Sequence, residues 1–200
     1  AKWKRPSPET IPTAAKAASF SNNAGTGALV DTAGGKTTYA ARWIAAPGVN
    51  ILAPYALAGS GAMALWSGTS MSAPLVSGSL LLLESAWPIL KTNGTAANLL
   101  LTTATDLGTK GIDNTYGNGL VNLGPAFQPV GALSVTQANG KTLAVSSITG
   151  AMITGGALGS LAAVKASLAN YAAFDTYQRN FTVNLSGLIA SKPTGASLNA

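Results

Sequence analysis

The sequence predicts a mixed α/β fold on three observations. Short runs with β-branched or aromatic residues, at 39–44 and 49–52, are typical of strands. Two longer apolar runs follow, each bounded by residues that start and stop helices, and alternating polarity returns after about residue 129. A chain of 200 residues with 47% apolar residues is large enough to bury a core.

The first part of the chain is predicted to be loop and short strands. Residues 1–30 are polar and rich in turn formers, among them three prolines within the first 12 residues. The two predicted strands then flank a turn at residues 46–48, which read Ala-Pro-Gly.

A buried helix is predicted over residues 70–87. Thr69 and Ser70 are candidate caps at its start, and Pro74 suits a first turn. The letters LVSGSLLLLESAW are apolar nearly all round, which indicates a helix enclosed by protein, and Pro88 stops it.

A second helix is predicted over residues 95–108 (TAANLLLTTATDLG), with Thr95 as cap and Gly108 as terminator. The letters GPAF then predict a short helical turn. Because the pattern changes to short alternating segments afterwards, we place a boundary near Gln128, between residues 1–128 and a mostly β or irregular extension, residues 129–200.

Composition excludes several classes of function. Only 9% of residues are charged, against about 25% in an average soluble protein, and this indicates an exported chain. With no cysteine, no histidine and six acidic residues, we expect no disulfide, no metal and no cofactor. The net charge of +6 is spread thinly, so we expect no nucleic-acid partner. No apolar run reaches the ~18 residues of a membrane-spanning helix.

The candidate catalytic group is the hydroxyl of Ser70, within LWSGTSMSAPLVSG. A serine becomes a nucleophile when a base takes its proton and backbone N–H groups face the developing oxyanion. A helix start offers such N–H groups, and Gly68 allows a tight turn before it. The pattern Gly-x-Ser-x-Gly is not matched, because residue 72 is serine, and no serine precedes a lysine by three residues. From the residues alone, the alternative that Ser70 only caps the helix stays open.

GTSMSAP, at residues 68–74, resembles the nucleophile signature of the subtilisin family of serine peptidases, whose common form is GTSMAAP. Flanking segments follow the family's order: ASFSNNAG and AAPGVNI before it, ATDLG and YGNGLVNLGPA after it. The resemblance implies that residues 1–128 are the C-terminal part of a subtilase catalytic domain, with a parallel sheet, flanking helices and Ser70 as catalytic serine. Leu75 departs from the family, which usually has a non-catalytic histidine there.

The family's triad runs in the order Asp, His, Ser, and the segments with the first two residues lie well before the serine. Neither is present here, and none of Asn22, Asn23 or Asn50 takes the role of the family's oxyanion asparagine. We therefore expect the chain alone to be nearly inactive. If another base served Ser70, Lys36 and Lys91 would be the candidates nearest in sequence.

The tail has a resemblance of its own. PAFQPVGALSV and FDTYQRNFTVNL resemble the segment that joins the subtilase domain to the membrane barrel in bacterial autotransporter peptidases. This implies a protein that is secreted or on the bacterial cell surface, and that meets a membrane only through a barrel outside this chain.

The preferred interpretation is thus part of a secreted serine endopeptidase that acts on peptide or protein substrates. A serine esterase or lipase with the same site, and a non-catalytic scaffold fragment, remain as alternatives. Because part of a subtilase domain would leave apolar helix faces uncovered, we expect association with the missing N-terminal segment or with a second copy.

Overall fold

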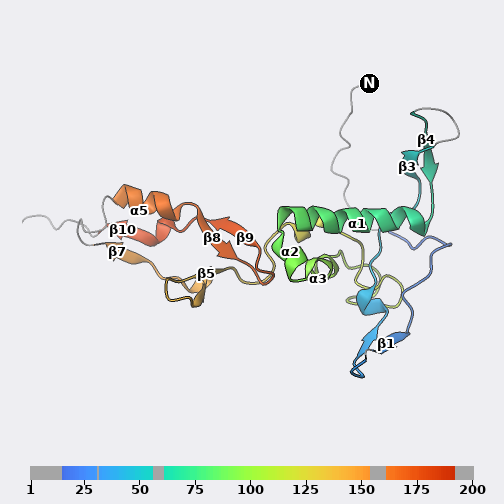
Figure 1. Ribbon diagram of the computed structural model, residues 1–200, viewed down its shortest axis with the longest axis horizontal. Helices are drawn as coiled ribbons and strands as arrows, with labels where there is room; N and C mark the ends of the chain where they lie inside the picture. Colours follow the sequence, from blue (N-terminus) through green and yellow to red (C-terminus); the bar gives the residue numbers. More distant parts are fainter. Residues whose placement is uncertain (1–14, 31, 56–60, 154–160, 192–200) are drawn as a thin grey trace, which may run out of the picture. The chain divides into compact units, whose positions relative to one another are not determined.

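The computed structural model describes residues 15–30, 32–55, 61–153 and 161–191 (Figure 1). The chain divides into two compact units. The first comprises residues 1–85 and 96–126, and the second comprises residues 86–95 and 127–200. The described residues form a mixed α/β structure with small sheets, as predicted at that level.

The described part of the first unit holds two antiparallel hairpins and three helices longer than a 3-10 turn. In chain order its elements are β1 (Ala28–Val30), β2 (Lys36–Thr38), η1 (Ala40–Arg42), β3 (Ile51–Pro54), β4 (Met63–Trp66), α1 (Thr69–Ala86), α3 (Ala96–Thr102) and α4 (Leu123–Ala126). The β1–β2 pair and the β3–β4 pair are separate two-stranded sheets. The β3–β4 hairpin stands at the end of α1 where that helix begins (Figure 1).

The helix predicted over residues 70–87 is confirmed as α1. Its start is as expected, but Pro74 is the sixth helical residue and so lies beyond the first turn. Proline has no N–H, so residue 74 donates no hydrogen bond to the carbonyl of Ser70. The turn that contains Ser70 therefore lacks one of its internal bonds.

The expected enclosure of α1 on every side is wrong for the described residues. Only Ser79 and Leu83 of this helix are buried. They are four residues apart and share one face, whereas Leu75, Leu81 and Leu82 are 40%, 68% and 54% exposed. The apolar pattern would suit a helix covered on several sides, but the described residues cover only the face of α1 that carries Ser79 and Leu83.

The second predicted helix is shorter than expected. It ends at Thr102 as α3, and not near Gly108. Thr105 exchanges two backbone hydrogen bonds of 2.8 Å with Leu120, and this bridge draws the chain out of the helix. The expected helical turn at GPAF is present as α4.

The strand predictions are partly wrong. Half of the predicted strand over residues 39–44 is the 3-10 turn η1, two of whose carbonyls accept side-chain hydrogen bonds. The strand predicted at 49–52 lies two residues later, as β3. A parallel sheet around β3 is not confirmed: its partner is β4, and so short a connection joins antiparallel strands.

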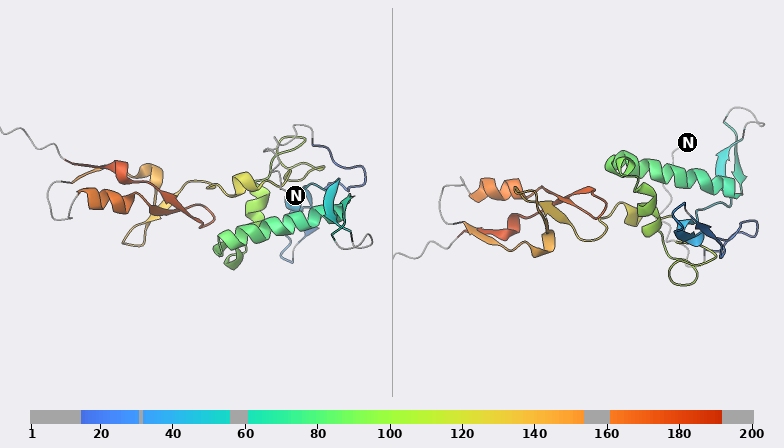
Figure 2. Two further views of the ribbon diagram at one scale, coloured as in Figure 1. Left: turned by 90° about the horizontal axis from the view of Figure 1, so that it is seen from above. Right: turned by 60° about the horizontal axis from the view of Figure 1, so that its bottom comes forward.

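The second unit contains a four-stranded antiparallel sheet in the order β6–β5–β8–β9, and a parallel pair of β7 and β10. Its elements are α2 (Ile89–Thr92), β5 (Ser134–Thr136), β6 (Thr142–Ala144), η3 (Val145–Ser147), β7 (Ala151–Ile153), α5 (Leu161–Leu168), β8 (Tyr171–Phe174), β9 (Asn180–Val183), η5 (Ser186–Leu188) and β10 (Ile189–Ser191). Helix α5, drawn in orange in Figure 2, packs against η5.

The centre of the second unit is an ion pair between Asp175 and Arg179, whose side chains are both fully buried. The guanidinium donates from Nε and Nη2 to Asp175 Oδ2, at 3.0 and 2.6 Å, and from Nη2 to the Gln128 carbonyl at 2.8 Å. Its Cζ lies 4.8 Å from the Trp87 ring centre and 5.2 Å from that of Phe181. Hydrogen bonds and ring contacts together offset the cost of burying two charges.

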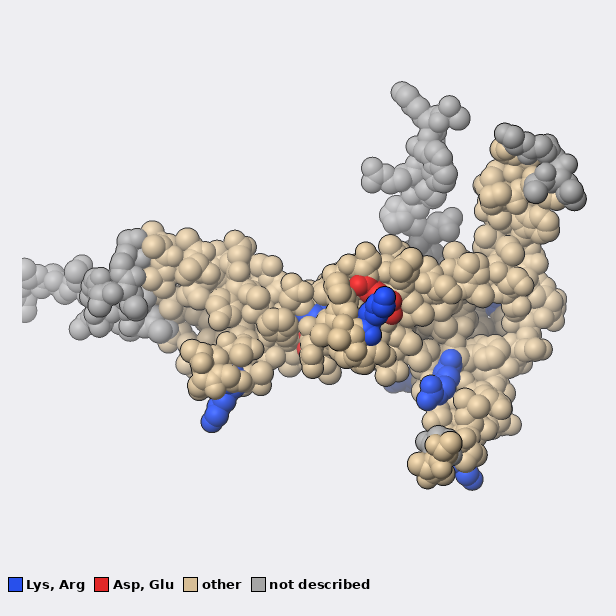
Figure 3. Space-filling view, viewed as in Figure 1, with Lys and Arg blue, Asp and Glu red and all other residues tan. Residues whose placement is uncertain are grey.

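Charged side chains are sparse on the face drawn in Figure 3, as the composition suggests. Within the described ranges, no helix has both the length and the apolar character needed to cross a bilayer.

Candidate active site

Ser70 is the second residue of α1, and it is exposed. Its backbone N–H belongs to the first turn, where N–H groups have no partner within the helix and carry the positive end of the helix dipole. The chain reaches it from β4 through Ser67 and Gly68. The geometry therefore offers an accessible hydroxyl beside an N–H group that can stabilise negative charge.

Three contacts tie the approach to Ser70 to the segment 46–50. The Gly68 N–H donates to the Gly48 carbonyl at 2.8 Å. The Asn50 N–H donates to Ser67 Oγ at 3.0 Å. The third contact comes from Ser72, whose hydroxyl reaches two carbonyls of the same segment.

The chain just before the segment 46–50 is hydrogen-bonded to residues near the end of the first unit. Ala45 donates to the Gly119 carbonyl and accepts from the Val121 N–H, both at 2.8 Å. The side-chain amide of Asn118 donates to the carbonyls of Ala40, Ala41 and Trp43, at 3.2, 3.1 and 3.0 Å. Hydrogen bonds thus join segments more than 70 residues apart in sequence, and these segments together support the turn that carries Ser70.

The loop before Asn118 is organised by one carboxylate. Asp113 accepts hydrogen bonds from the backbone N–H groups of Tyr116, Thr115 and Thr109, at 2.7, 2.8 and 3.0 Å. The Tyr116 bond in particular, with those of Thr115 and Thr109, holds the pKa of Asp113 below its ordinary value of 3.8, against the opposing effect of desolvation. The carboxylate therefore stays ionised at neutral pH and fixes this loop.

The other residues considered from the sequence lie elsewhere. Lys36 is in β2, and Lys91 is in α2 of the second unit. Asn22 and Asn23 line a recess with Arg42, and Asn50 has a positive φ of 55° and binds Ser67 through its backbone. None of the contacts described for these residues gives them a catalytic role.

Sequence reasoning missed the structural roles of Ser72 and Asn118. Ser72 was visible as the one departure from GTSMAAP within the motif, and Asn118 stands within YGNGLVN. The hydrogen bonds of both side chains reach residues at least 25 positions away, so only the fold reveals them.

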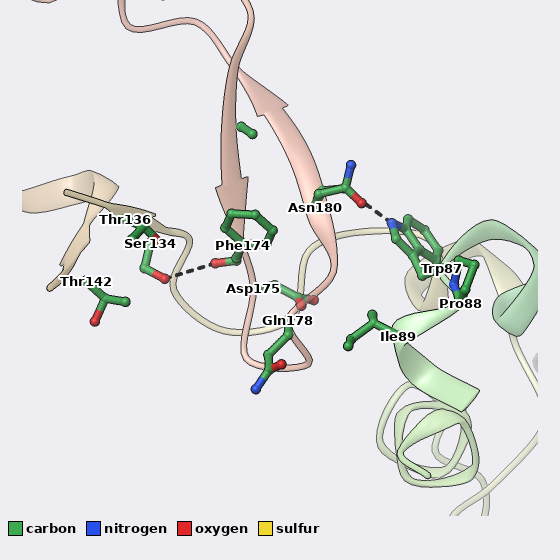
Figure 4. A pocket seen from close by; sticks show the side chains of 11 residues that line it. Trp87, Pro88, Ile89, Ser134, Thr136, Thr142, Phe174, Asp175, Gln178 and Asn180 are labelled. Carbon is green, nitrogen blue, oxygen red and sulfur yellow. Dashed lines mark hydrogen bonds between the residues drawn. The ribbon is translucent and has the colours of Figure 1, made fainter. Parts of the chain in front are cut away.

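A separate groove of about 720 Å³ lies in the second unit, beside the sheet (Figure 4). Trp87 and Phe174 are among its aromatic walls, and Ser134, Thr136 and Asn180 add neutral polar groups. The lining carboxylate, Asp175, is already engaged by Arg179. The groove thus offers surface for contact but no free acid, base or activated nucleophile among its lining residues.

Comparison with known proteins identifies the family. The Subtilase family profile (peptidase S8) matches residues 12–119, more than half of the chain, and this range includes Ser70, the segment 46–50 and Asn118. The chain belongs to the subtilase family. The resemblance of GTSMSAP to the subtilase nucleophile motif is therefore not a coincidence of short sequence.

Individual relatives agree with this membership. The chain is 54% identical over 56 residues to "Serotype-specific antigen 1" of Mannheimia haemolytica, and 48% identical over 61 residues to "Extracellular serine protease" of Serratia marcescens. It is 43% identical over 61 residues to "Neisserial autotransporter lipoprotein NalP" of Neisseria meningitidis serogroup B. The matched segments cover 28–30% of this subtilase chain and 6% of each relative.

Proposed function

We propose that the chain is part of a secreted, subtilisin-like serine endopeptidase, with Ser70 as the nucleophile that is acylated by the substrate. The observation that carries the proposal is the exposed Ser70 at the start of α1, within GTSMSAP, in a chain that belongs to the subtilase family. The relatives named as an extracellular protease and an autotransporter support the localisation, outside the cell or on its surface.

In the proposed reaction, Ser70 Oγ attacks the carbonyl carbon of a peptide bond while a base takes its proton. The Ser70 N–H, which has no helical partner, donates to the oxygen that becomes negative. The base gives the proton from Ser70 Oγ to the amine product, which leaves. Water then attacks the ester carbonyl while the base takes its proton, and that proton returns to Ser70 Oγ as the ester bond breaks. Substrates are peptides or proteins, and no cofactor takes part.

The base is proposed to come from a segment outside these 200 residues, since the sequence contains no histidine. Subtilases carry their Asp and His before the serine segment. Oxyanion donors and substrate binding alone retain about 10³–10⁴ over the reaction in water, far less than a complete triad. Residues 1–200 alone are therefore expected to hydrolyse peptides near the background rate.

The same proposal accounts for the exposed leucines of α1. In the whole catalytic domain, the N-terminal segment is proposed to complete a parallel sheet and to cover the face that carries Leu81 and Leu82, which are 68% and 54% exposed. Residues 1–128 are then the C-terminal part of this domain. Residues 129–200 are proposed as an extension toward a membrane barrel outside the chain.

The proposal is tested by restoring the missing segment. The whole protein, with its N-terminal segment, should hydrolyse casein and react with a fluorophosphonate probe at Ser70, and Ser70→Ala should abolish both. Ser77→Ala, an exposed serine two turns later on α1, is the matched control and should keep full activity.

Three results would contradict the proposal. Whole protein whose casein hydrolysis survives Ser70→Ala would exclude Ser70 as nucleophile. Brisk hydrolysis of a short nitrophenyl ester with none of casein would favour an esterase. Fluorophosphonate labelling absent from a folded whole protein would favour a scaffold without catalysis.

A further inference from the structure

The hydroxyl of Ser72 is placed to hold the catalytic turn in position. Ser72 Oγ lies 3.0 Å from the carbonyl oxygen of Ala46 and 3.2 Å from that of Pro47, so its single proton is shared between two acceptors. The residue belongs to the same helical turn as Ser70, two positions later. It stands where the common motif, GTSMAAP, has an alanine that could not make these bonds.

The segment that accepts these bonds approaches the helix very closely at Gly48. A Cβ added to Gly48 would collide with Ser72 Oγ and would lie 3.0 Å from the Gly68 carbonyl oxygen. A side chain larger than hydrogen fits here only if the Ser72 hydroxyl turns away or the helix start shifts. The close approach at Gly48 and the Ser72 hydrogen bonds thus join the same two parts of the chain, the segment 46–48 and the start of α1.

The helix itself holds this turn less firmly than usual. Residue 74 is a proline, so the Ser70 carbonyl receives no hydrogen bond from four residues ahead. Contacts from outside the helix therefore add to what fixes the turn. Besides the Ser72 hydroxyl, the described contacts are the Gly68 N–H to the Gly48 carbonyl and the Asn50 N–H to Ser67.

We propose that Ser72 is a positioning residue: its hydroxyl holds the segment 46–48 against the first turn of α1 and thereby sets the direction of Ser70 Oγ and the Ser70 N–H. This inference rests on the proposed function of Ser70. Ser72 touches neither substrate nor reacting atoms, and it acts on the chemical step through the backbone of its own turn. Displacement of a catalytic group by about 1 Å can cost a hundredfold in rate.

The test uses the whole protein, including its N-terminal segment, and compares Ser72→Ala, Ser72→Thr and the control Ser77→Ala. In Ser72→Ala we expect kcat on a peptide substrate to fall about tenfold, with KM within twofold, because one neutral hydrogen bond no longer restricts the turn. The rate of fluorophosphonate labelling at Ser70 should fall in parallel. Ser72→Thr, which keeps the hydroxyl, should restore kcat to within about twofold, and Ser77→Ala should equal the wild type.

The outcomes separate this inference from the proposed function. If Ser70→Ala abolishes hydrolysis but Ser72→Ala keeps kcat within twofold, the positioning role is overturned and Ser70 stands. If Ser72→Thr is as slow as Ser72→Ala, the hydroxyl is not what matters, and the inference again fails. If hydrolysis survives Ser70→Ala, the proposed function itself fails.

A second variant decides the case in which Ser72→Ala does not fold. Gly48→Ala keeps the hydroxyl but forces it away from the segment 46–48. It should lower kcat at least tenfold with KM little changed. Gly48→Ala with unaltered kcat would overturn the inference.

Discussion

The ion pair in the second unit permits a sharp test of the structure through Asp175→Asn, which keeps the shape of the side chain and removes its charge. Asp175 Oδ1 accepts from the backbone N–H groups of Tyr177 and Arg179, at 2.9 and 3.0 Å. Oδ2 accepts from the Val130 N–H at 3.1 Å and from two guanidinium nitrogens. An asparagine that keeps its oxygen toward Tyr177 would turn an NH₂ group toward three donors.

The expected cost follows from these contacts. Arg179 is fully buried, and removing the partner of a buried charge typically costs about 3–5 kcal/mol. The Val130 N–H also loses its acceptor, and an unsatisfied buried donor costs about 1–3 kcal/mol. We therefore expect Asp175→Asn to lower the free energy of unfolding of the second unit by at least about 3 kcal/mol.

The assay is hydrogen–deuterium exchange in increasing urea, read by mass spectrometry on peptides that cover residues 127–136 and 171–183. The control is Asp106→Asn, whose exposed carboxylate accepts from the Gly111 N–H at 2.8 Å. It should leave exchange in those peptides unchanged. A loss of less than about 1 kcal/mol in Asp175→Asn would refute the buried pair as the centre of this unit.

Three further predictions concern the first unit. Asn118→Ala should lower the stability of this unit by about 1–3 kcal/mol in urea unfolding, because three carbonyls lose a donor. Asn118→Asp should not restore it, because an ionised carboxylate has no donor. Since the pKa of Asp113 in the folded protein lies below 3.8, the contribution of this carboxylate to stability is complete above pH 3.8 and is lost as the pH falls through the folded pKa. The melting temperature of Asp113→Asn should lack this dependence on acid pH. Replacing exposed Leu81 and Leu82 by glutamine should leave urea stability within about 0.5 kcal/mol but reduce self-association in sedimentation velocity, and unchanged association would argue against this face as the contact.

Local signals were enough to predict α1 and α4. Caps, a proline stop and an unbroken apolar run act over neighbouring residues, so the helix of residues 69–86 follows from its own letters. The motif around Ser70 is also a local signal, since it consists of seven consecutive residues. Family membership, which the profile match over residues 12–119 establishes, was accessible for that reason.

The failures occur where a distant segment competes for the backbone. Residues 39–44 have the β-branched and aromatic content of a strand, yet the Asn118 amide takes the carbonyls of Ala40 and Ala41 and the chain forms a 3-10 turn. In the same way, the bridge between Thr105 and Leu120 ends α3 early. Such pairings bring together residues 15 to 78 positions apart, and no local pattern encodes them.

The sequence by itself determined the helix whose second residue is Ser70, the chemistry available to that serine and the absence of any histidine to activate it. Residue type and short-range spacing are sufficient for those properties. Only the tertiary structure decided how the turn around Ser70 is held, because Ser72 bonds to residues 25 and 26 positions earlier and Gly48 must lie against the helix for those bonds to form. Hydrogen bonds depend on distances of about 3 Å between atoms, and folding alone sets such distances between remote residues.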